Sequence, residues 1–226
     1  MNELPQTKRM SSSDIAYNEL KQKIIELQYE PDSQLVEEEL STALNVSRTP
    51  LRQALYRLEL EGLIVKQANG RMRVAPVSLM EVEEVYKVRE VLEGLLAREA
   101  TIHMTDEKIQ QLEDVLVLMK LSAEQNRVKH TVRYSIEFHS VLYSLSTNQT
   151  VKRLMEQLNG SIERYRRISG YKNPEFKPIV PVQEHQEIFK LIQDGDPEKV
   201  EEEVRKHTIR KLAVAKETLE LYFAKK

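Results

Sequence analysis

The sequence contains no cysteine and no tryptophan, and only 6 of its 226 residues are glycine. The absence of cysteine excludes disulfides, thiolate metal ligands and cysteine nucleophiles. No apolar run approaches the roughly 18 residues that a membrane-spanning helix needs. Residues 1–13 are polar and lack the apolar centre of a secretory signal. We therefore expect a cytoplasmic protein with no membrane partner.

The residues that are present favour helices. Hydrophobic residues make up 40% of the chain and charged residues 31%, and leucine, isoleucine and valine are plentiful. This mixture is typical of helices packed on helices rather than of a β-sandwich. The chain is long enough to bury two modest cores. The predicted fold class is mainly α.

Two helical patterns follow the polar N-terminus. From Ser13, apolar side chains recur at helical spacing, and Pro31-Asp32 is expected to end this segment. A second, shorter helix is expected over residues 37–44, because its apolar side chains also share one face. Asn45-Val46 then predicts a tight turn.

A third helix has signals at both ends. Thr49 is the expected N-cap and Pro50 the first helical residue, where a missing N–H group is tolerated. Gly62 is expected to stop the helix. Two short apolar runs follow, at 63–65 and 72–75, and Asn69-Gly70 between them is a strong hairpin signal. Three helices followed by a β-hairpin predict a winged helix-turn-helix over residues 11–76.

The exposed side of the third helix and the hairpin carry groups that suit DNA. Arginine can bind O6 and N7 of guanine, and hydroxyl groups suit phosphate oxygens. The alternative is a solvated basic face on a structural helix, but the order of cap, apolar stripe, stop and hairpin favours DNA binding. The candidate DNA-binding residues are Arg48, Thr49, Arg52, Gln53, Tyr56, Lys66, Asn69 and Arg71.

Three motifs in this region resemble the GntR family of transcriptional regulators. They are LVEEEL at 35–40, VSRTPLRQAL at 46–55 and LELEGL at 58–63. The resemblance implies a homodimer that binds a palindromic operator in double-stranded DNA. It also implies that Arg48 and Arg52 are DNA-contacting arginines.

The rest of the chain shows only helical patterns. Residues 77–79 are expected to be a linker, and Ser78 with Glu81 forms a capping box that opens the next helix. Helices are expected near 79–102, 106–124, 128–146, 149–169, 181–194 and 197–223. The predicted division is therefore a flexible tail (1–10), a winged helix-turn-helix (11–76), the linker, and an all-helical domain for effector binding and dimerisation (80–226).

Three of the five histidines lie on or beside apolar faces of separate predicted helices: His139, His185 and His207. Neutral imidazoles from three helices can hold one divalent transition metal, such as Zn, Ni or Mn. A buried histidine that is satisfied within a core is the commoner case. The spacing alone leaves both interpretations open.

Arg89 lies among apolar positions at helical spacing, so its guanidinium needs an anionic partner. One interpretation is an intrahelical pair with Glu93. The other is a clamp for a small carboxylate effector. Tyr134, Ser135 and Arg167 are further candidates for the same site, with Tyr165, Arg164 and Arg166 competing for the role of Tyr134 and Arg167.

Residues 80–222 resemble the ligand-sensing domain of the FadR branch of the GntR family. The likeness rests on the helix through Tyr86, Arg89 and Glu93, on Phe138-His139 with Asn148 downstream, on Glu184-His185 and on His207. The resemblance implies an effector site at Arg89 and a divalent metal held by one Asp and three His. The position of that Asp, four residues before the first His, is Ser135 here, a neutral and poor ligand. Two outcomes stay open: a three-His site completed by water or an effector oxygen, and a pocket without metal.

The predicted function is a ligand-responsive, sequence-specific transcriptional regulator, and a repressor is favoured. One alternative is a DNA-binding dimer that senses no effector. A metal-dependent enzyme is the other, but the sequence shows no motif that positions a general base and no phosphate-binding glycine-rich loop.

Overall fold

The computed structural model describes residues 10–224, so residues 1–9 of the expected tail lie outside the described residues. The prediction of a mainly α fold is confirmed, with a small sheet in the N-terminal part. The chain divides into two compact units, Met1–Pro76 and Val77–Lys226, and each is described by itself. No helix in the described range is long and apolar enough to cross a membrane.

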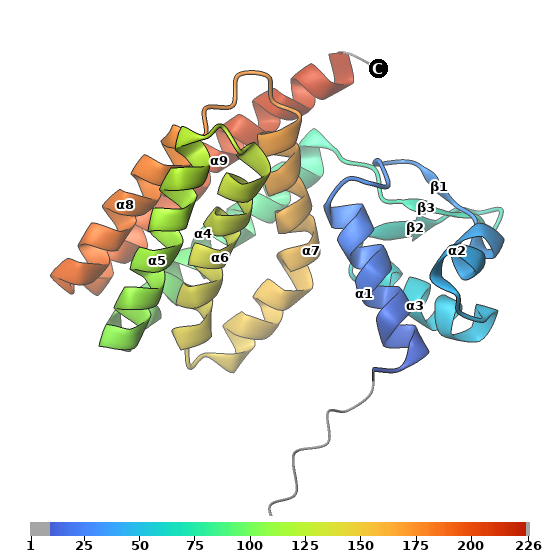
Figure 1. Cartoon of the computed structure of the whole chain (residues 1–226), viewed down its shortest axis with the longest axis horizontal. Helices are drawn as coiled ribbons and strands as arrows, with labels where there is room; N and C mark the ends of the chain where they lie inside the picture. The colour runs from blue at the N-terminus through green and yellow to red at the C-terminus, as the bar shows by residue number, and fades with distance from the viewer. Residues whose placement is uncertain (1–9, 225–226) are drawn as a thin grey trace, which may run out of the picture. The chain divides into compact units, whose positions relative to one another are not determined.

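The first unit has three helices and a three-stranded antiparallel sheet of order β1-β3-β2 (Figure 1). Its elements are α1 (Ser12–Ile25), β1 (Gln34–Leu35), α2 (Glu37–Leu44), α3 (Arg48–Leu60), β2 (Ile64–Lys66) and β3 (Met72–Val74). In the register of the sheet, Met72 of β3 is paired with Leu35 of β1 on one side and with Lys66 of β2 on the other. The apolar faces of α1 and α3 pack together around fully buried leucines such as Leu20 and Leu55. The predicted winged helix-turn-helix is therefore present.

Two boundaries in this unit differ from the sequence-based expectation. α1 ends at Ile25, well before Pro31-Asp32, because Leu27 takes a left-handed conformation with φ 59°. α3 begins at Arg48 and not after Thr49, because Ser47 already has the extended backbone of a cap residue. Pro50 is then the third residue of the helix, where an N–H would still lack an acceptor within the helix.

The turn of the hairpin is longer than Asn69-Gly70. Gln67 donates its backbone N–H to Arg71, and Gly70 donates its own to Gln67, both at 2.8 Å. Gly70 has φ 82°, and the Asn69 side chain accepts the backbone N–H of Arg71 at 3.0 Å. This is a four-residue turn that ends in a left-handed glycine, a common alternative to the two-residue turn.

The second unit is a bundle of helices, and its described residues form no strand. Its elements are α4 (Leu79–Ile102), α5 (Asp106–Glu124), α6 (Val128–Leu145), α7 (Gln149–Tyr171), α8 (Ile179–Asp194) and α9 (Pro197–Ala224). α4 and α9 pack along each other, and α5 packs against α6 and α8 (Figure 1). Ser78 caps α4 by accepting the backbone N–H of Glu81 at 3.0 Å, as its capping box predicts. The helix ends lie within about two residues of the predicted ones, the usual uncertainty of such boundaries.

Candidate functional site

The exposed side of α3 carries five of the candidate DNA-binding residues. Leu51, Ala54, Leu55 and Leu58 form its buried stripe. Arg48, Thr49, Arg52, Gln53 and Tyr56 are all exposed. Tyr56 leaves 60% of its surface open, which is unusual for an aromatic side chain and leaves its hydroxyl available. The structure thus gathers these side chains along one face of one helix.

Two arginines of α3 have different surroundings. Arg52 is 65% exposed, and its Nε lies 2.9 Å from Oε2 of Glu37 on α2. Arg57 instead lies over the ring of Tyr17, at 3.7 Å, and binds Asp14 at 2.8 Å. Exposed ion pairs are weak, so a phosphate or a base can replace Glu37 as the partner of Arg52. Arg57 belongs to the contact between α1 and α3.

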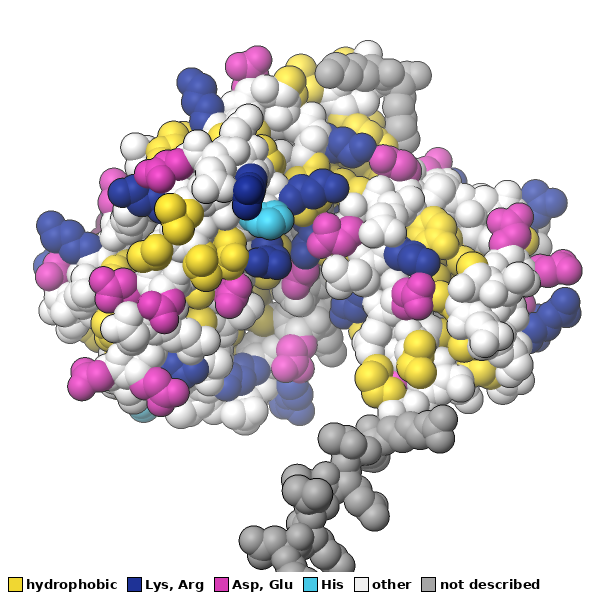
Figure 2. Space-filling view, viewed as in Figure 1, with side chains coloured by type: hydrophobic (Ala, Val, Ile, Leu, Met, Phe, Trp, Pro, Cys, Tyr) yellow, Lys and Arg dark blue, Asp and Glu magenta, His cyan; other side chains and the backbone are white. Residues whose placement is uncertain are grey.

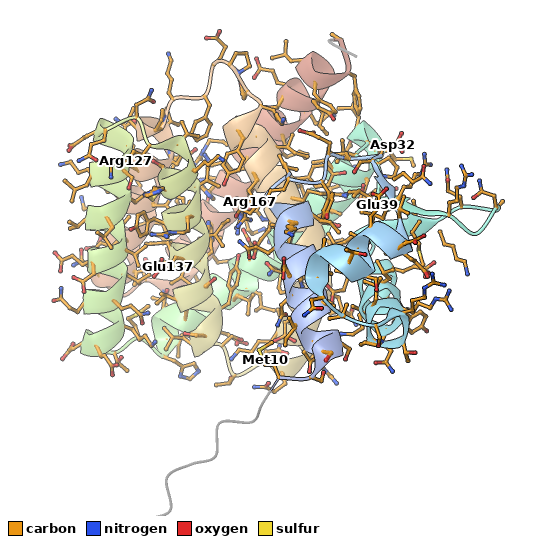
Figure 3. The ribbon with its side chains drawn as sticks, turned by 45° about the vertical axis from the view of Figure 1, so that its right-hand side comes forward. Met10, Asp32, Glu39, Arg127, Glu137 and Arg167 are labelled. Carbon is orange, nitrogen blue, oxygen red and sulfur yellow. The ribbon has the colours of Figure 1, made fainter. Side chains whose placement is uncertain are left out.

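The hairpin presents the remaining DNA-binding candidates. Lys66 ends β2 and Arg71 precedes β3, and both side chains are exposed. Asn69 is also exposed, although its side chain oxygen is engaged within the turn. The neighbouring Arg73 pairs with Asp32, which is labelled in Figure 3, at 2.6 Å.

Three histidines converge inside the second unit. His139 of α6, His185 of α8 and His207 of α9 are each at most 1% exposed. One ring nitrogen from each lies within 4.8 Å of those of the other two. Burial lowers the pKa of His139 and of His185 well below 6.5, and lowers the pKa of His207 to about 4. All three imidazoles are therefore neutral at pH 7, which is the form that binds metals.

The histidines are oriented by their neighbours. His185 Nδ1 lies 2.6 Å from the carbonyl oxygen of Pro181, so this nitrogen donates and Nε2 keeps a free lone pair. That Nε2 is 3.3 Å from Nε2 of His139 and 3.2 Å from the Ser135 hydroxyl. His207 Nδ1 lies 3.4 Å from a carboxylate oxygen of Glu184. Metal-binding histidines commonly hold their second nitrogen as His185 holds Nδ1. Nδ1 of His139 and of His207 is buried without a hydrogen-bond partner. The three imidazoles therefore fit a divalent transition metal, with the Ser135 hydroxyl beside them.

A cavity of about 60 Å³ adjoins the histidines. On the face drawn in Figure 2, a histidine side chain is visible with several Lys and Arg side chains around it. Among the described residues, the lining combines basic, hydroxyl-bearing and apolar side chains and contains no carboxylate. It consists of Tyr86, Arg89, Thr131, Val132, Ser135, His139, Arg166, Ser169, Phe176, Pro181, His207, Lys211 and Val214.

A buried ionic network joins two of the lining residues, Arg89 and Arg166, to Glu93 of α4. Arg89 Nε and Arg166 Nη2 each lie 2.9 Å from Oε1 of Glu93. Tyr143 also donates to Oε1, and Thr208 donates to Oε2 at 3.0 Å. Burial alone would raise the pKa of Glu93, but the charges of Arg89 and Arg166 outweigh it and lower that pKa to about 2. Arg89 Nη1 is buried and has no hydrogen-bond partner.

The effector candidates divide into two groups. Arg89 and Ser135 line the cavity. Tyr134 and Arg167 do not, which corrects their expected place: Tyr134 packs beside two apolar clusters, and Arg167 of α7, labelled in Figure 3, pairs with Glu163 at 2.7 Å. Successive helical residues point about 100° apart, so Arg166 faces the cavity where its neighbour does not.

Sequence reasoning missed Lys211 and ranked Arg166 below Arg167. Lys211 lies one helical turn after His207 and therefore shares its face of α9. The same spacing links Ser135 to His139 on α6. A search for basic residues four positions from each candidate histidine finds Lys211 directly.

The first unit is a winged helix-turn-helix and the second holds a cavity beside three buried histidines. Comparison with known proteins identifies the class. Residues 13–74 match the gntR family of bacterial regulatory proteins, and residues 84–210 match the FCD domain. The chain therefore belongs to the GntR family of transcriptional regulators, in the group that carries an FCD domain. Its families and relatives are regulators and not enzymes, as predicted.

Individual relatives agree with this assignment. The chain is 29% identical to the HTH-type transcriptional regulator YdhC of Bacillus subtilis over 198 residues, covering 84% of this chain and 85% of YdhC. It is 27% identical to the transcriptional repressor RspR of Escherichia coli over 192 residues, covering 84% of this chain and 83% of RspR.

Solved structures share the fold. E. coli McbR/YncC superposes with a TM-score of 0.80 at 18% identity, over 94% of this chain and 99% of that one. A protein from Rhodococcus sp. RHA1 that is described as a transcriptional regulator GntR superposes with a TM-score of 0.75 at 20% identity, over 91% of this chain and 98% of that one.

Proposed function

We propose that this regulator is a ligand-responsive repressor that binds a palindromic operator as a homodimer. Arg48, Thr49, Arg52, Gln53 and Tyr56 of α3 would enter the major groove, and Lys66, Asn69 and Arg71 of the hairpin would contact the neighbouring backbone. The relative RspR is itself named a repressor, which supports that direction of control.

The effector in this proposal is a small carboxylate in the cavity of the second unit. The observation that carries it is Arg89: a buried guanidinium that lines the cavity and leaves Nη1 without a partner. An unsatisfied buried donor on a charged group is costly, and a carboxylate oxygen would satisfy it. Arg166 and Lys211 line the same cavity and add positive charge. The alternative, a DNA-binding dimer without sensing, leaves Arg89 Nη1 unexplained.

Control would follow from linkage. An effector changes operator affinity only if it binds the DNA-competent and DNA-incompetent states of the dimer unequally. A carboxylate that draws Arg89 and Arg166 towards the cavity would act on α4 and α7 together, because Glu93 joins these two residues.

The DNA part of the proposal is tested by Arg52→Ala on an operator selected from random duplexes. Loss of a base-reading arginine should weaken operator binding by about 1–3 kcal/mol and relax specificity at one position. Arg57→Ala is the matched control, because that arginine lies on the same helix but contacts Tyr17 and Asp14. Equal operator binding by Arg52→Ala and the parent protein would remove Arg52 from the interface.

The effector part is tested by Arg89→Lys. Lysine keeps the charge opposite Glu93 but removes the second nitrogen of the guanidinium. A panel of small carboxylates is screened by thermal shift, and each binder is then added to the operator complex. We expect a binder that changes operator affinity in the parent protein and has a weaker effect on Arg89→Lys. A panel with no binder would sink the carboxylate assignment while leaving DNA binding intact.

A further inference from the structure

We infer that Glu37 of α2 is a positioning residue for DNA recognition: it holds Nε of Arg52, so that the two terminal nitrogens of Arg52 are directed at a guanine. The inference rests on the proposed function, in which Arg52 contacts the operator. It goes beyond that function in two ways, because it gives a role to a residue outside the DNA-contacting set and names the base that Arg52 reads.

The contact between Glu37 and Arg52 uses only one of the three nitrogens of the guanidinium. Arg52 Nε donates to Oε2 of Glu37 at 2.9 Å and lies 3.3 Å from Oε1. Nη1 and Nη2 of Arg52 have no hydrogen bond or ion pair with any of the described residues. These two nitrogens form a planar fork of N–H groups at the end of the side chain. The ion pair therefore orients the guanidinium and leaves its fork free.

A guanine in the major groove matches this free fork. Its O6 and N7 are neighbouring acceptors, whereas the major-groove edge of adenine pairs an acceptor with a donor and those of thymine and cytosine offer no second acceptor. A phosphate oxygen can accept from any N–H of an arginine, so it gains nothing from an oriented fork. A phosphate can take the place of Glu37 at Nε, but a guanine bound through Nη1 and Nη2 leaves the ion pair in place.

Both side chains project from fixed elements of the first unit. Glu37 begins α2, and Leu40, one turn later, is buried in the core of this unit. Arg52 follows Leu51, which is fully buried on α3. The Glu37 side chain is 33% exposed and that of Arg52 is 65% exposed. The carboxylate is thus the fixed partner, and it removes rotamer freedom from the arginine before DNA arrives, which lowers the entropy lost on binding.

The exposed arginines of α3 differ in this respect. Arg57 lies against Tyr17 and Asp14. The Arg48 side chain, one helical turn before Arg52, has no hydrogen bond or ion pair with the described residues. Of these three arginines, Arg52 alone is both oriented by a neighbouring carboxylate and open at its terminal nitrogens.

The test compares base preferences over a library of random duplexes, from which bound duplexes are recovered and sequenced. It uses the parent protein, Glu37→Ala, Arg52→Ala and the double variant. In the parent protein we expect a guanine that is preferred by about 5–150-fold, the range of a bidentate contact, and whose preference Arg52→Ala abolishes. Glu37→Ala should lower the same preference by at least about 3-fold and leave other positions unchanged. Glu37→Gln, which keeps an acceptor for Nε, should restore part of it.

Glu39→Ala is the matched control. Glu39, labelled in Figure 3, lies in the same turn of α2 and is exposed, and it contacts no arginine among the described residues. Both alanine variants remove one negative charge near the DNA, so both should bind every duplex somewhat more tightly. Only Glu37→Ala should lower the guanine preference, and it should have no further effect on that preference in the Arg52→Ala background.

Modified bases test the contact in the parent protein without any substitution. At the selected position, 7-deazaguanine lacks the N7 acceptor, whereas inosine keeps both O6 and N7. We expect 7-deazaguanine to weaken binding by at least about 3-fold and inosine to change it little. The loss caused by 7-deazaguanine should be smaller for Glu37→Ala.

The outcomes separate the inference from the proposed function. If Glu37→Ala keeps the full guanine preference while Arg52→Ala loses it, Glu37 has no positioning role and the proposed contact of Arg52 stands. A Glu37→Ala effect that persists without Arg52 would also overturn the inference, because Glu37 would then act on the DNA directly. A preferred base other than guanine would overturn the base assignment. If Arg52→Ala retains every base preference, the inference and the proposed contact of Arg52 are both wrong.

Discussion

Single residues in the second unit combine burial with charge in a way that the sequence shows only in part. Arg89 on an apolar helix face predicts an anionic partner, and the structure supplies Glu93 as that partner while Nη1 has no hydrogen-bond partner. The two interpretations of Arg89 made from sequence, an intrahelical pair and a clamp, are therefore compatible. Which of Arg166 and Arg167 faces the cavity could not be predicted, because the rotation of α7 is set by packing with its neighbours.

The three histidines give a residue-scale prediction about pH. Their pKa values are lowered by burial, so between pH 6.5 and about 4 the unfolded chain takes up protons that the folded chain does not. Stability should therefore fall as the pH falls through this window, by about 1.4 kcal/mol per pH unit for each histidine. The check is urea denaturation of chelator-treated protein at a series of pH values.

A variant isolates the contribution of one histidine. His139→Gln removes one titrating imidazole, so its stability should fall less steeply with acidification than that of the parent protein. The quantity to compare is the slope of the unfolding free energy against pH. The absolute stability is not informative here, because the substitution also changes it. An unaltered slope, or resonances assigned to His139, His185 or His207 that titrate near pH 6.5 in the folded state, would contradict the assignment.

At the scale of helices and strands, the sequence is most informative where patterns are long. α4, α5 and α6 carry many turns of apolar periodicity, and the side chains of Ser78 and Thr105 cap the starts of α4 and α5, so these bounds could be predicted closely. β1 has two residues, too few to show alternation, and could not be found. The start of α3 was misplaced because Ser47, Thr49 and Pro50 all give valid signals for a helix start within one turn.

The contact between α6 and α7 gives a prediction at this scale. A Cβ atom added at Gly170 of α7 would lie 2.5 Å from Cγ2 of Val132 on α6, which lines the cavity. A helical Gly→Ala change normally stabilises by up to about 1 kcal/mol. Here the β-branched Val132 has little freedom to move, so Gly170→Ala should destabilise the protein by about 1–3 kcal/mol in denaturant titration.

Two comparisons test the cause. Gly94→Ala would approach Arg205 Cγ at 2.6 Å, but that arginine is 40% exposed and can change rotamer at the cost of its exposed ion pair with Glu90, so the loss of stability should be smaller than for Gly170→Ala. Val132→Ala combined with Gly170→Ala should recover part of the loss. A stabilising Gly170→Ala would show that α6 and α7 are not in tight contact at this point.

At the scale of the whole molecule, the net charge of −2 conceals a separation of charge that matters for DNA. The acidic residues of α2 lie beside the basic face of α3, and the hairpin adds exposed Lys66 and Arg71. Affinity for DNA should therefore depend on these few local contacts and not on overall charge. The sequence predicts this separation, but it does not establish how many copies of the chain bind one operator.

Salt dependence can count those copies. Each lost phosphate contact lowers the slope of log affinity against log salt by about 0.9. If Lys66 contacts one phosphate in each protomer, Lys66→Ala should lower the slope by about 0.9 for a monomer on the operator and by about twice that for a homodimer. Arg71→Ala provides a second, independent count. Lys206→Ala, which removes an exposed lysine of α9 paired with Glu202, should leave the slope unchanged.

For Lys66→Ala we expect the doubled decrease in slope, because the proposed palindromic operator presents the same contact twice. A single decrement would exclude the homodimer on DNA, whereas no decrement for either hairpin variant would place the hairpin outside the interface.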